Sequence, residues 1–169
     1  VELLDVYDES KRKIGKKIRR GDELSSGERL LVTHLCLFNS KGEMLIQRRS
    51  FEKDRYPGCW DVSAGGFVLS GENSESAVIR EAKEELGLCL KPSELRFILC
   101  EPFSYVFDDF FFARADLDPS ALNIQSQELS EVKYFPAEDI MHMLSDGRFV
   151  DYDEDLMKRI FDFEKTCRL

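Results

Sequence analysis

The chain has 169 residues, of which 43% are hydrophobic and 34% charged, and its formal net charge is −9. This composition is typical of a globular protein, and the length is enough to bury a substantial core. The acidic balance argues against nonspecific binding to nucleic acid or to an anionic membrane, since both depend on basic patches. We therefore predict one domain over residues 1–169 with neither class of partner.

The five cysteines are odd in number and form no C-x-x-C pair, which favours reduced thiols over disulfides or a zinc site. The sequence shows no signal peptide, no apolar run of membrane length and no lipidation motif. These observations predict a cytoplasmic protein.

The first predicted element is a hairpin, in which strand-like runs at 3–7 and 13–18 flank the polar turn 8–11. A loop follows over 21–27. The apolar run 30–38 then predicts a central strand.

A turn at 39–42 leads to the partner of that strand at 43–49. The segment 51–60 contains Pro57-Gly58 and predicts an irregular loop, which leads into a short strand at 61–63.

Two more strands are predicted at 95–107 and 110–115, with Asp108-Asp109 marking a turn or bulge between them. The segment 116–128 reads as a loop. A strand at 131–135 follows.

Helices are predicted at 137–144 and at 153–167, where Leu156, Ile160 and Phe163 share one face. Strands interleaved with helices indicate an α/β sandwich in which no linker or repeat calls for a second domain.

The segment between Gly66 and Leu88 contains most of the chemical information. On a helix that turns about 100° per residue, Glu81, Glu84 and Glu85 share one face. Like charges at this spacing destabilise a helix by about 0.2–0.5 kcal/mol per pair, so the pattern indicates a compensating cation. Carboxylate oxygens suit hard ions, which points to Mg²⁺ or Mn²⁺.

The ends of this helix are also marked in the sequence. Asn73 is a suitable N-cap and Gly87 a suitable C-terminal residue, so the helix is predicted over 74–86. Arg80 is placed to pair with a glutamate one turn later, and Glu72 to brace the preceding loop through its amides or through Arg80.

Residues 66–88 follow the pattern G-x5-E-x7-R-E-U-x-E-E-x-G-U, where U is aliphatic and Ala82 is the weakest fit. The pattern resembles the Nudix box. The resemblance implies an α/β/α sandwich with a mixed sheet, and hydrolysis of a diphosphate linkage in a nucleoside diphosphate joined to another group X. A small, nucleotide-derived diphosphate is the implied partner.

The same resemblance implies that Glu81, Glu84 and Glu85 hold the metal. A backbone carbonyl at Gly65, where Gly65-Gly66 permits close approach, is a further candidate ligand. We assign catalytic roles to Glu81, Arg80 and Glu84. Glu81, Glu128 and Glu131 remain alternatives for the general base, and the number of metal ions is open.

A basic cluster, Arg48, Arg49, Lys53 and Arg55, precedes the glycine pair. Either it is a solvated strand end and loop, or at least one member contacts phosphate. We take Arg48, Arg49 and Lys53 as candidate substrate-binding residues.

The flanking sequence resembles the Nudix subgroup related to isopentenyl-diphosphate isomerase. That chemistry needs a cysteine and a histidine where this chain has Gly65 and Phe67, and its other histidine and acid align near Leu30 and Phe107. Hydrolysis is therefore preferred over isomerisation. The isomerase and a catalytically silent nucleotide sensor are the alternatives.

Other chemistry-bearing residues have simpler explanations. His34 lies in an apolar run and is expected to be packed or hydrogen-bonded rather than a ligand. The aromatics are expected in the core more often than stacked on a base. The aromatics considered are Trp60, Phe103, Tyr105 and Phe107.

The oligomeric state is open, with a homodimer as one alternative.

Overall fold

The computed structural model describes residues 2–168, which form strands, α-helices and short 3-10 helices. In chain order these are β1 (Leu3–Tyr7), β2 (Lys13–Arg19), β3 (Leu30–Phe38), β4 (Met44–Arg49), β5 (Trp60–Asp61), β6 (Ala64–Phe67), α1 (Ser74–Leu86), η1 (Pro92–Glu94), β7 (Arg96–Phe103), β8 (Val106–Arg114), η2 (Pro119–Ala121), β9 (Leu129–Phe135), α2 (Ala137–Ser145) and α3 (Glu154–Thr166).

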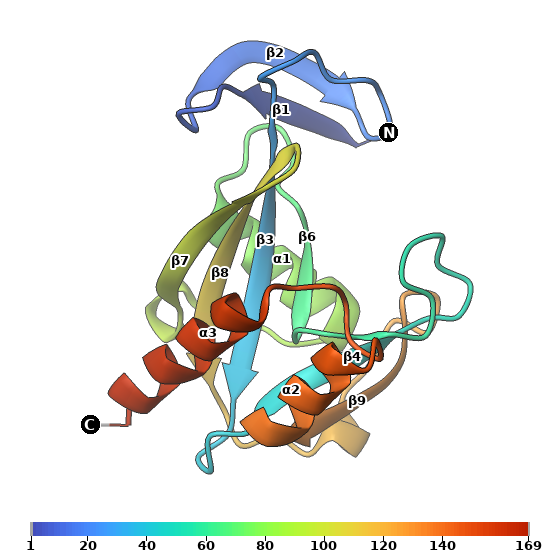
Figure 1. Cartoon of the computed structure of the whole chain (residues 1–169), viewed down its shortest axis with the longest axis vertical. Coiled ribbons are helices and arrows are strands. Elements are labelled where there is room, and N and C mark those ends of the chain that lie inside the picture. The colour runs from blue at the N-terminus through green and yellow to red at the C-terminus, as the bar shows by residue number, and fades with distance from the viewer. Residues whose placement is uncertain (1, 169) are drawn as a thin grey trace.

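Strand β3 is apolar and buried on both faces, which places it at the centre of the molecule. Because side chains alternate along a strand, Leu37 packs with α1 while Phe38 packs with α2 and α3. In Figure 1, α2 and α3 lie in front of the sheet and α1 behind it. The predicted α/β/α sandwich is confirmed.

The sheet is mixed, with strand order β5-β4-β3-β8-β7, while β6 also pairs with β3 and β9 with β4. Strands β3 and β8 are parallel, and the other pairs are antiparallel. The edge of β3 is divided, since 32–35 pairs with β6 and Leu37-Phe38 pairs with β4. At the division the Ser63 hydroxyl accepts from Leu37 N–H and donates to the Leu45 carbonyl. Strand β6 is thereby held beside β3 next to α1.

Strands β1 and β2 form the predicted hairpin, a separate two-stranded sheet at the top of Figure 1. Isolated bridges join Leu4 to Leu69 and Tyr7 to Arg29. The hairpin thus lies against the segment that connects β6 to α1.

The prediction of a turn or bulge at Asp108-Asp109 is wrong, because both residues lie inside β8 and the turn is at Ser104-Tyr105. Each acid has a partner in the folded chain. Asp108 Oδ1 lies 2.8 Å from His34 Nε2, and the buried Asp109 pairs with Lys11 of the hairpin. Tertiary partners therefore allow two charged residues within a strand.

The single short strand predicted at 61–63 is also wrong. Two strands replace it: β5 overlaps it only at Asp61, β6 begins after it at Ala64, and the glycine pair belongs to β6. The strand predicted at 95–107 ends four residues earlier, at Phe103, and the strand predicted at 110–115 begins four residues earlier, at Val106. The remaining predicted elements agree with the structure to within two residues. None of the cysteines, all of which lie in the described residues, forms a disulfide. No helix among residues 2–168 is long and apolar enough to span a membrane.

Candidate active site

Helix α1 is fixed at both ends by local hydrogen bonds. The Asn73 side chain accepts from Ser76 N–H at 2.8 Å, and the Ser76 hydroxyl accepts from Asn73 N–H at 3.1 Å. At the other end Gly87 adopts φ 69°, and its N–H donates to the Lys83 carbonyl. The predicted helix, its caps and its span are confirmed.

The buried stripe of α1 determines where its acidic face points. Val78, Ala82 and Leu86 are fully buried against the sheet, as the apolar pattern indicates. The three glutamates then differ in exposure: the side chain of Glu84 is 54% exposed, that of Glu81 is 13% exposed, and Glu85 is buried. The acidic face therefore runs from solvent to the sheet.

Arg80 joins this face to the preceding loop. Its Nε and Nη2 donate to the two oxygens of Glu72 at 2.8 and 3.0 Å, and Nη2 also donates to the Phe67 carbonyl at 3.0 Å. Its Nη1 donates to Glu81 at 2.7 Å and to Glu84 at 3.3 Å. The predicted pairing of Arg80 with a glutamate one turn later is confirmed.

Glu72 braces the loop by both predicted routes, since it also accepts from Leu69 N–H at 3.0 Å. Although burial raises the pKa of Glu72, the hydrogen bonds from Arg80 and Leu69 outweigh it and lower the pKa overall. The hydrogen bond to Glu72 and the contacts with Glu81 outweigh burial and raise the pKa of Arg80. This part of the site is a fixed ion-paired frame at any neutral pH.

Glu85 lies deepest and has a different electrostatic environment. Its Oε2 accepts from Gly65 N–H at 3.1 Å and from Gln47 Nε2 at 3.2 Å. Burial, followed by the charge of Glu81, raises the pKa of Glu85 to about 8 despite the Gly65 hydrogen bond. Burial also raises the pKa of Glu81, against the opposing effect of Arg80. Extra positive charge here would favour the ionised carboxylates.

The glycine pair lets strand and helix approach closely. A Cβ on Gly66 would lie 2.3 Å from Glu81 Oε1, and a Cβ on Gly65 would lie 2.7 Å from the Thr33 carbonyl and 2.9 Å from His34 Nδ1. Neither glycine has a positive φ. These positions therefore lack side chains because of the space available.

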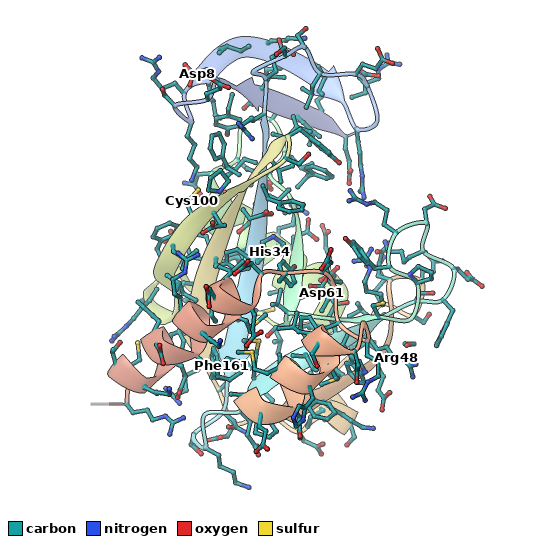
Figure 2. The ribbon with its side chains drawn as sticks, viewed as in Figure 1. Asp8, His34, Arg48, Asp61, Cys100 and Phe161 are labelled. Atoms are coloured by element: carbon teal, nitrogen blue, oxygen red, sulfur yellow. The ribbon has the colours of Figure 1, made fainter. Side chains whose placement is uncertain are left out.

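The basic cluster divides between the two faces of the sheet. Arg48 donates from Nε to the Gly58 carbonyl at 2.9 Å, and its guanidinium lies over the rings of Phe51 and Trp60. It thus lies on the α2 side of the sheet (Figure 2). Strand alternation directs the Arg48 side chain to the opposite face from Gln47, so this geometry favours Arg49 and Lys53 over Arg48 for phosphate contact.

Arg49 and Lys53 lie on the glutamate side. Arg49 Nη1 approaches Asp61 Oδ2 at 3.4 Å, and Lys53 pairs with Glu128. The charges of both acids also contribute to the raised pKa of Glu85. The two cations are therefore at the edge of the acidic face.

Of the alternatives for the base, Glu128 is nearer to this face than Glu131. Glu128 acts electrostatically on Glu85. Glu131 is paired with Lys133 and lies opposite Arg48 in the β4–β9 register, which directs it to the α2 side. The geometry leaves Glu81 and Glu128 as alternatives.

Three residues near the site were not predicted from the sequence to have a role there: Gln47, Asp61 and Arg20. Gln47 could have been noticed as a polar residue on the apolar face of β4. Arg20 lies on the hairpin, with its guanidinium 5.3 Å from the Phe67 ring centroid, and no local pattern links it to α1.

Asp61 connects the site to a polar group on the far side of β3. Tyr152 donates to Asp61 Oδ1 at 2.8 Å, and its hydroxyl lies 3.5 Å from His34 Nδ1. His34 is buried, stacks on Phe110 and binds Asp108 through its other nitrogen. The prediction of a packed, hydrogen-bonded histidine is confirmed (Figure 2).

The donor set of this site fits a hard divalent cation. It consists of carboxylate and backbone oxygens, and the Gln47 Oε1 beside it is buried without a hydrogen-bond partner among residues 2–168. In the described conformation, residues 2–168 include no group of three His, Cys, Asp or Glu side chains close enough together to bind an ion. Arg80 instead binds two of the three glutamates.

The profile of the NUDIX domain matches residues 28–157. The chain belongs to the Nudix family. An uncharacterised Nudix hydrolase of Listeria innocua is 38% identical over 152 residues, 90% of each chain. The crystal structure of DR0079 from Deinococcus radiodurans has a TM-score of 0.79 and 29% identity, covering 94% of this chain and 98% of that one. By these relationships, this Nudix protein is a hydrolase of the diphosphohydrolase class.

The similarity to the isomerase subgroup is also present. An isopentenyl-diphosphate Delta-isomerase of Escherichia coli is 33% identical over 111 residues, which are 63% of this chain and 61% of that protein. This match is shorter than the match to the Listeria hydrolase, and it confirms the similarity to that enzyme that the sequence suggested.

Proposed function

We propose that this Nudix protein hydrolyses a diphosphate linkage in a nucleoside diphosphate joined to another group, with Mg²⁺ or Mn²⁺ as cofactor. The observation that carries the proposal is the acidic face of α1, which lies against the glycine pair of β6 and has Arg49 and Lys53 at its edge. Such a face combines carboxylates that can bind a cation with positively charged side chains that can bind phosphate.

Glu81, Glu84 and Glu85 would hold the metal, with the Gly65 carbonyl as a further ligand. When bound, the ion would neutralise charge on the diphosphate and acidify a water molecule. Arg80 holds Glu81 and Glu84 in position through its ion pairs. Arg49 and Lys53 would bind and orient the anionic substrate.

Proton removal from the attacking water is assigned to Glu81 or Glu128. Glu81 is favoured by its place on the rigid helix, directly against the glycine pair of β6. Glu128 lies on the loop before β9 and is held in an ion pair with Lys53, as Glu81 is with Arg80.

Glu84→Gln tests the proposal. The side chain is 54% exposed and bonded only to Arg80 among the described residues, so the fold is expected to remain intact. We expect kcat/KM to fall by about 10²-fold or more, the scale for losing one electrostatic group. The measurement is phosphate release from nucleoside di- and triphosphates, sugar nucleotides, dinucleoside polyphosphates and coenzymes, with Mg²⁺ and with Mn²⁺.

The matched control is Glu75→Gln, an exposed acid in the first turn of the same helix. It is expected to keep wild-type turnover. Wild-type activity of Glu84→Gln on the cleaved substrate would refute the assignment. Thermal stabilisation by a nucleotide without any phosphate release would favour the silent sensor instead.

Isomerisation of an allylic diphosphate is less well supported by the site. A side chain at position 65 has no room, because its Cβ would meet the Thr33 carbonyl and His34. Isopentenyl diphosphate belongs in the same screen, and its conversion to the dimethylallyl isomer would revive this alternative. Cytoplasmic residence and one domain over the whole chain are parts of the same proposal.

A further inference from the structure

Gln47 is a polar residue on an otherwise apolar strand face. Strand β4 directs Leu45 and Gln47 toward α1, and both are buried, Gln47 at 3% exposure. A buried amide must find hydrogen bonds or it destabilises the fold.

Only one end of the Gln47 amide is hydrogen-bonded. Its Nε2 donates to Glu85 Oε2 at 3.2 Å, but its Oε1 has no partner among residues 2–168. It is the one buried side-chain polar atom left unpaired in that part of the chain. A methionine of similar size would avoid this cost, so stability alone does not explain a glutamine here.

The contacts of Glu85 show what the amide does. The Glu85 carboxylate accepts two hydrogen bonds from the described residues, and both end on Oε2, one from the Gly65 backbone N–H and one from Gln47 Nε2. Donors from two strands therefore fix one carboxylate oxygen against the sheet. The orientation of the other oxygen, Oε1, follows from this anchoring.

We propose that Gln47 is a positioning residue for the metal site: it holds Glu85 by Oε2 so that Oε1 faces the cation. Its own unpaired Oε1 provides an acceptor for a water of the hydrated ion. The inference rests on the proposed function, because it requires Glu85 to be a metal ligand. Groups that orient ligands in this way set metal affinity.

The test compares Gln47→Met with Leu45→Met, a matched change on the same buried face. The measurement is Mn²⁺ affinity of the substrate-free protein, from the electron paramagnetic resonance signal of unbound Mn²⁺. We expect Gln47→Met to weaken Mn²⁺ binding by about 10–100-fold, and Leu45→Met to leave it unchanged. Gln47→Asn, which keeps an amide but withdraws it, is a second variant with the same expected loss.

The metal-free melting temperature separates positioning from a structural role. Removing the unpaired oxygen offsets the lost hydrogen bond, so Gln47→Met should melt within about 3 °C of wild type. Its activity should recover as Mn²⁺ is raised, with kcat near wild type at saturation. Neither result is expected of a variant that merely unfolds.

Wild-type Mn²⁺ affinity in both Gln47 variants, while Glu85→Gln loses binding, would overturn the role of Gln47 and leave the proposed function standing. A wild-type protein that binds no Mn²⁺ would overturn both. Weakened binding in Gln47→Met that is matched in Leu45→Met would also overturn the inference, because packing would then be the cause.

Discussion

Gly65 and Gly66 are adjacent in β6, yet they are constrained by different neighbours. The atom that a Cβ on Gly66 would meet is the end of the Glu81 side chain, whereas a Cβ on Gly65 would meet a backbone carbonyl. The Glu81 side chain can change its rotamer, whereas the Thr33 carbonyl is fixed in the paired strand β3. The two positions should therefore separate function from stability.

Gly66→Ala is expected to displace the Glu81 carboxylate and lower kcat by about 10²-fold, with little change in melting temperature. Gly65→Ala is expected to lower the free energy of unfolding by about 1–3 kcal/mol, as overpacking does. Steady-state kinetics and urea unfolding of both variants check this. Wild-type kcat in Gly66→Ala would show that Glu81 need not lie against β6.

Residue type alone does not show which residues of the basic cluster lie on the glutamate side of the sheet. Arg48 and Arg49 are chemically equal in the sequence, but alternation along β4 places one beside Trp60 and the other beside Asp61. The sequence contained this alternation, but which face carries the site depends on where α1 packs.

At the scale of elements, α1 is the part best predicted from sequence. Asn73 and Gly87 fix its ends through contacts within four residues, and its apolar stripe fixes the face that it buries. Local interactions of this kind are present in the sequence itself. The hairpin β1–β2 was predictable for the same reason.

Asn73→Ala is expected to reduce the free energy of unfolding by about 1 kcal/mol, since the cap to Ser76 N–H is lost. Asn73→Asp retains an acceptor and serves as the control. Urea unfolding measures both. Because Asn73 touches none of the glutamates, kcat of the folded protein should not change; a large loss of kcat at unchanged stability would contradict this view.

Strand β8 shows where local reasoning failed. Asp108 and Asp109 by themselves predict a turn, but inside β8 Asp108 pairs with His34 of β3 and Asp109 pairs with Lys11 of the hairpin. Those partners are 74 and 98 residues away in the chain. Only the assembled sheet brings them together.

At the scale of the whole molecule, Glu164 ties the last helix to the sheet. Its buried carboxylate accepts from Arg114 of β8 at 2.9 Å and from Arg168 at 2.6 Å. Although burial alone raises the pKa of Glu164, the hydrogen bonds from Arg168 and Arg114 prevail and lower it. A carboxyl whose pKa is lowered by folding stabilises the fold when it is ionised.

Glu164→Gln is expected to cost about 3 kcal/mol at pH 7, the scale for breaking a buried ion pair. The stabilisation is fully present above the ordinary glutamate pKa of 4.5 and is lost as the pH falls below it, so the difference from wild type should shrink there. Urea unfolding across pH measures this. A difference that stays constant down to pH 3 would contradict it.

Asp162→Asn is the control for that experiment. Asp162 lies on the same helix and pairs with Lys165, but its side chain is 69% exposed. Exposed pairs contribute little, so the free energy of unfolding should change by less than about 1 kcal/mol.

The sequence by itself determined the class of fold, because the order of strands and helices is visible along the chain. It also determined the limits and caps of α1, the shared face of its three glutamates and the pairing of Arg80, because these depend on neighbours within a few turns of one helix. The tertiary structure alone decided that Glu85 is buried beneath Gln47, that Arg49 and not Arg48 lies beside the acidic face, and that two adjacent aspartates belong in a strand. The physical reason is that these features depend on which strand faces which helix, and that is settled only when distant segments pack together.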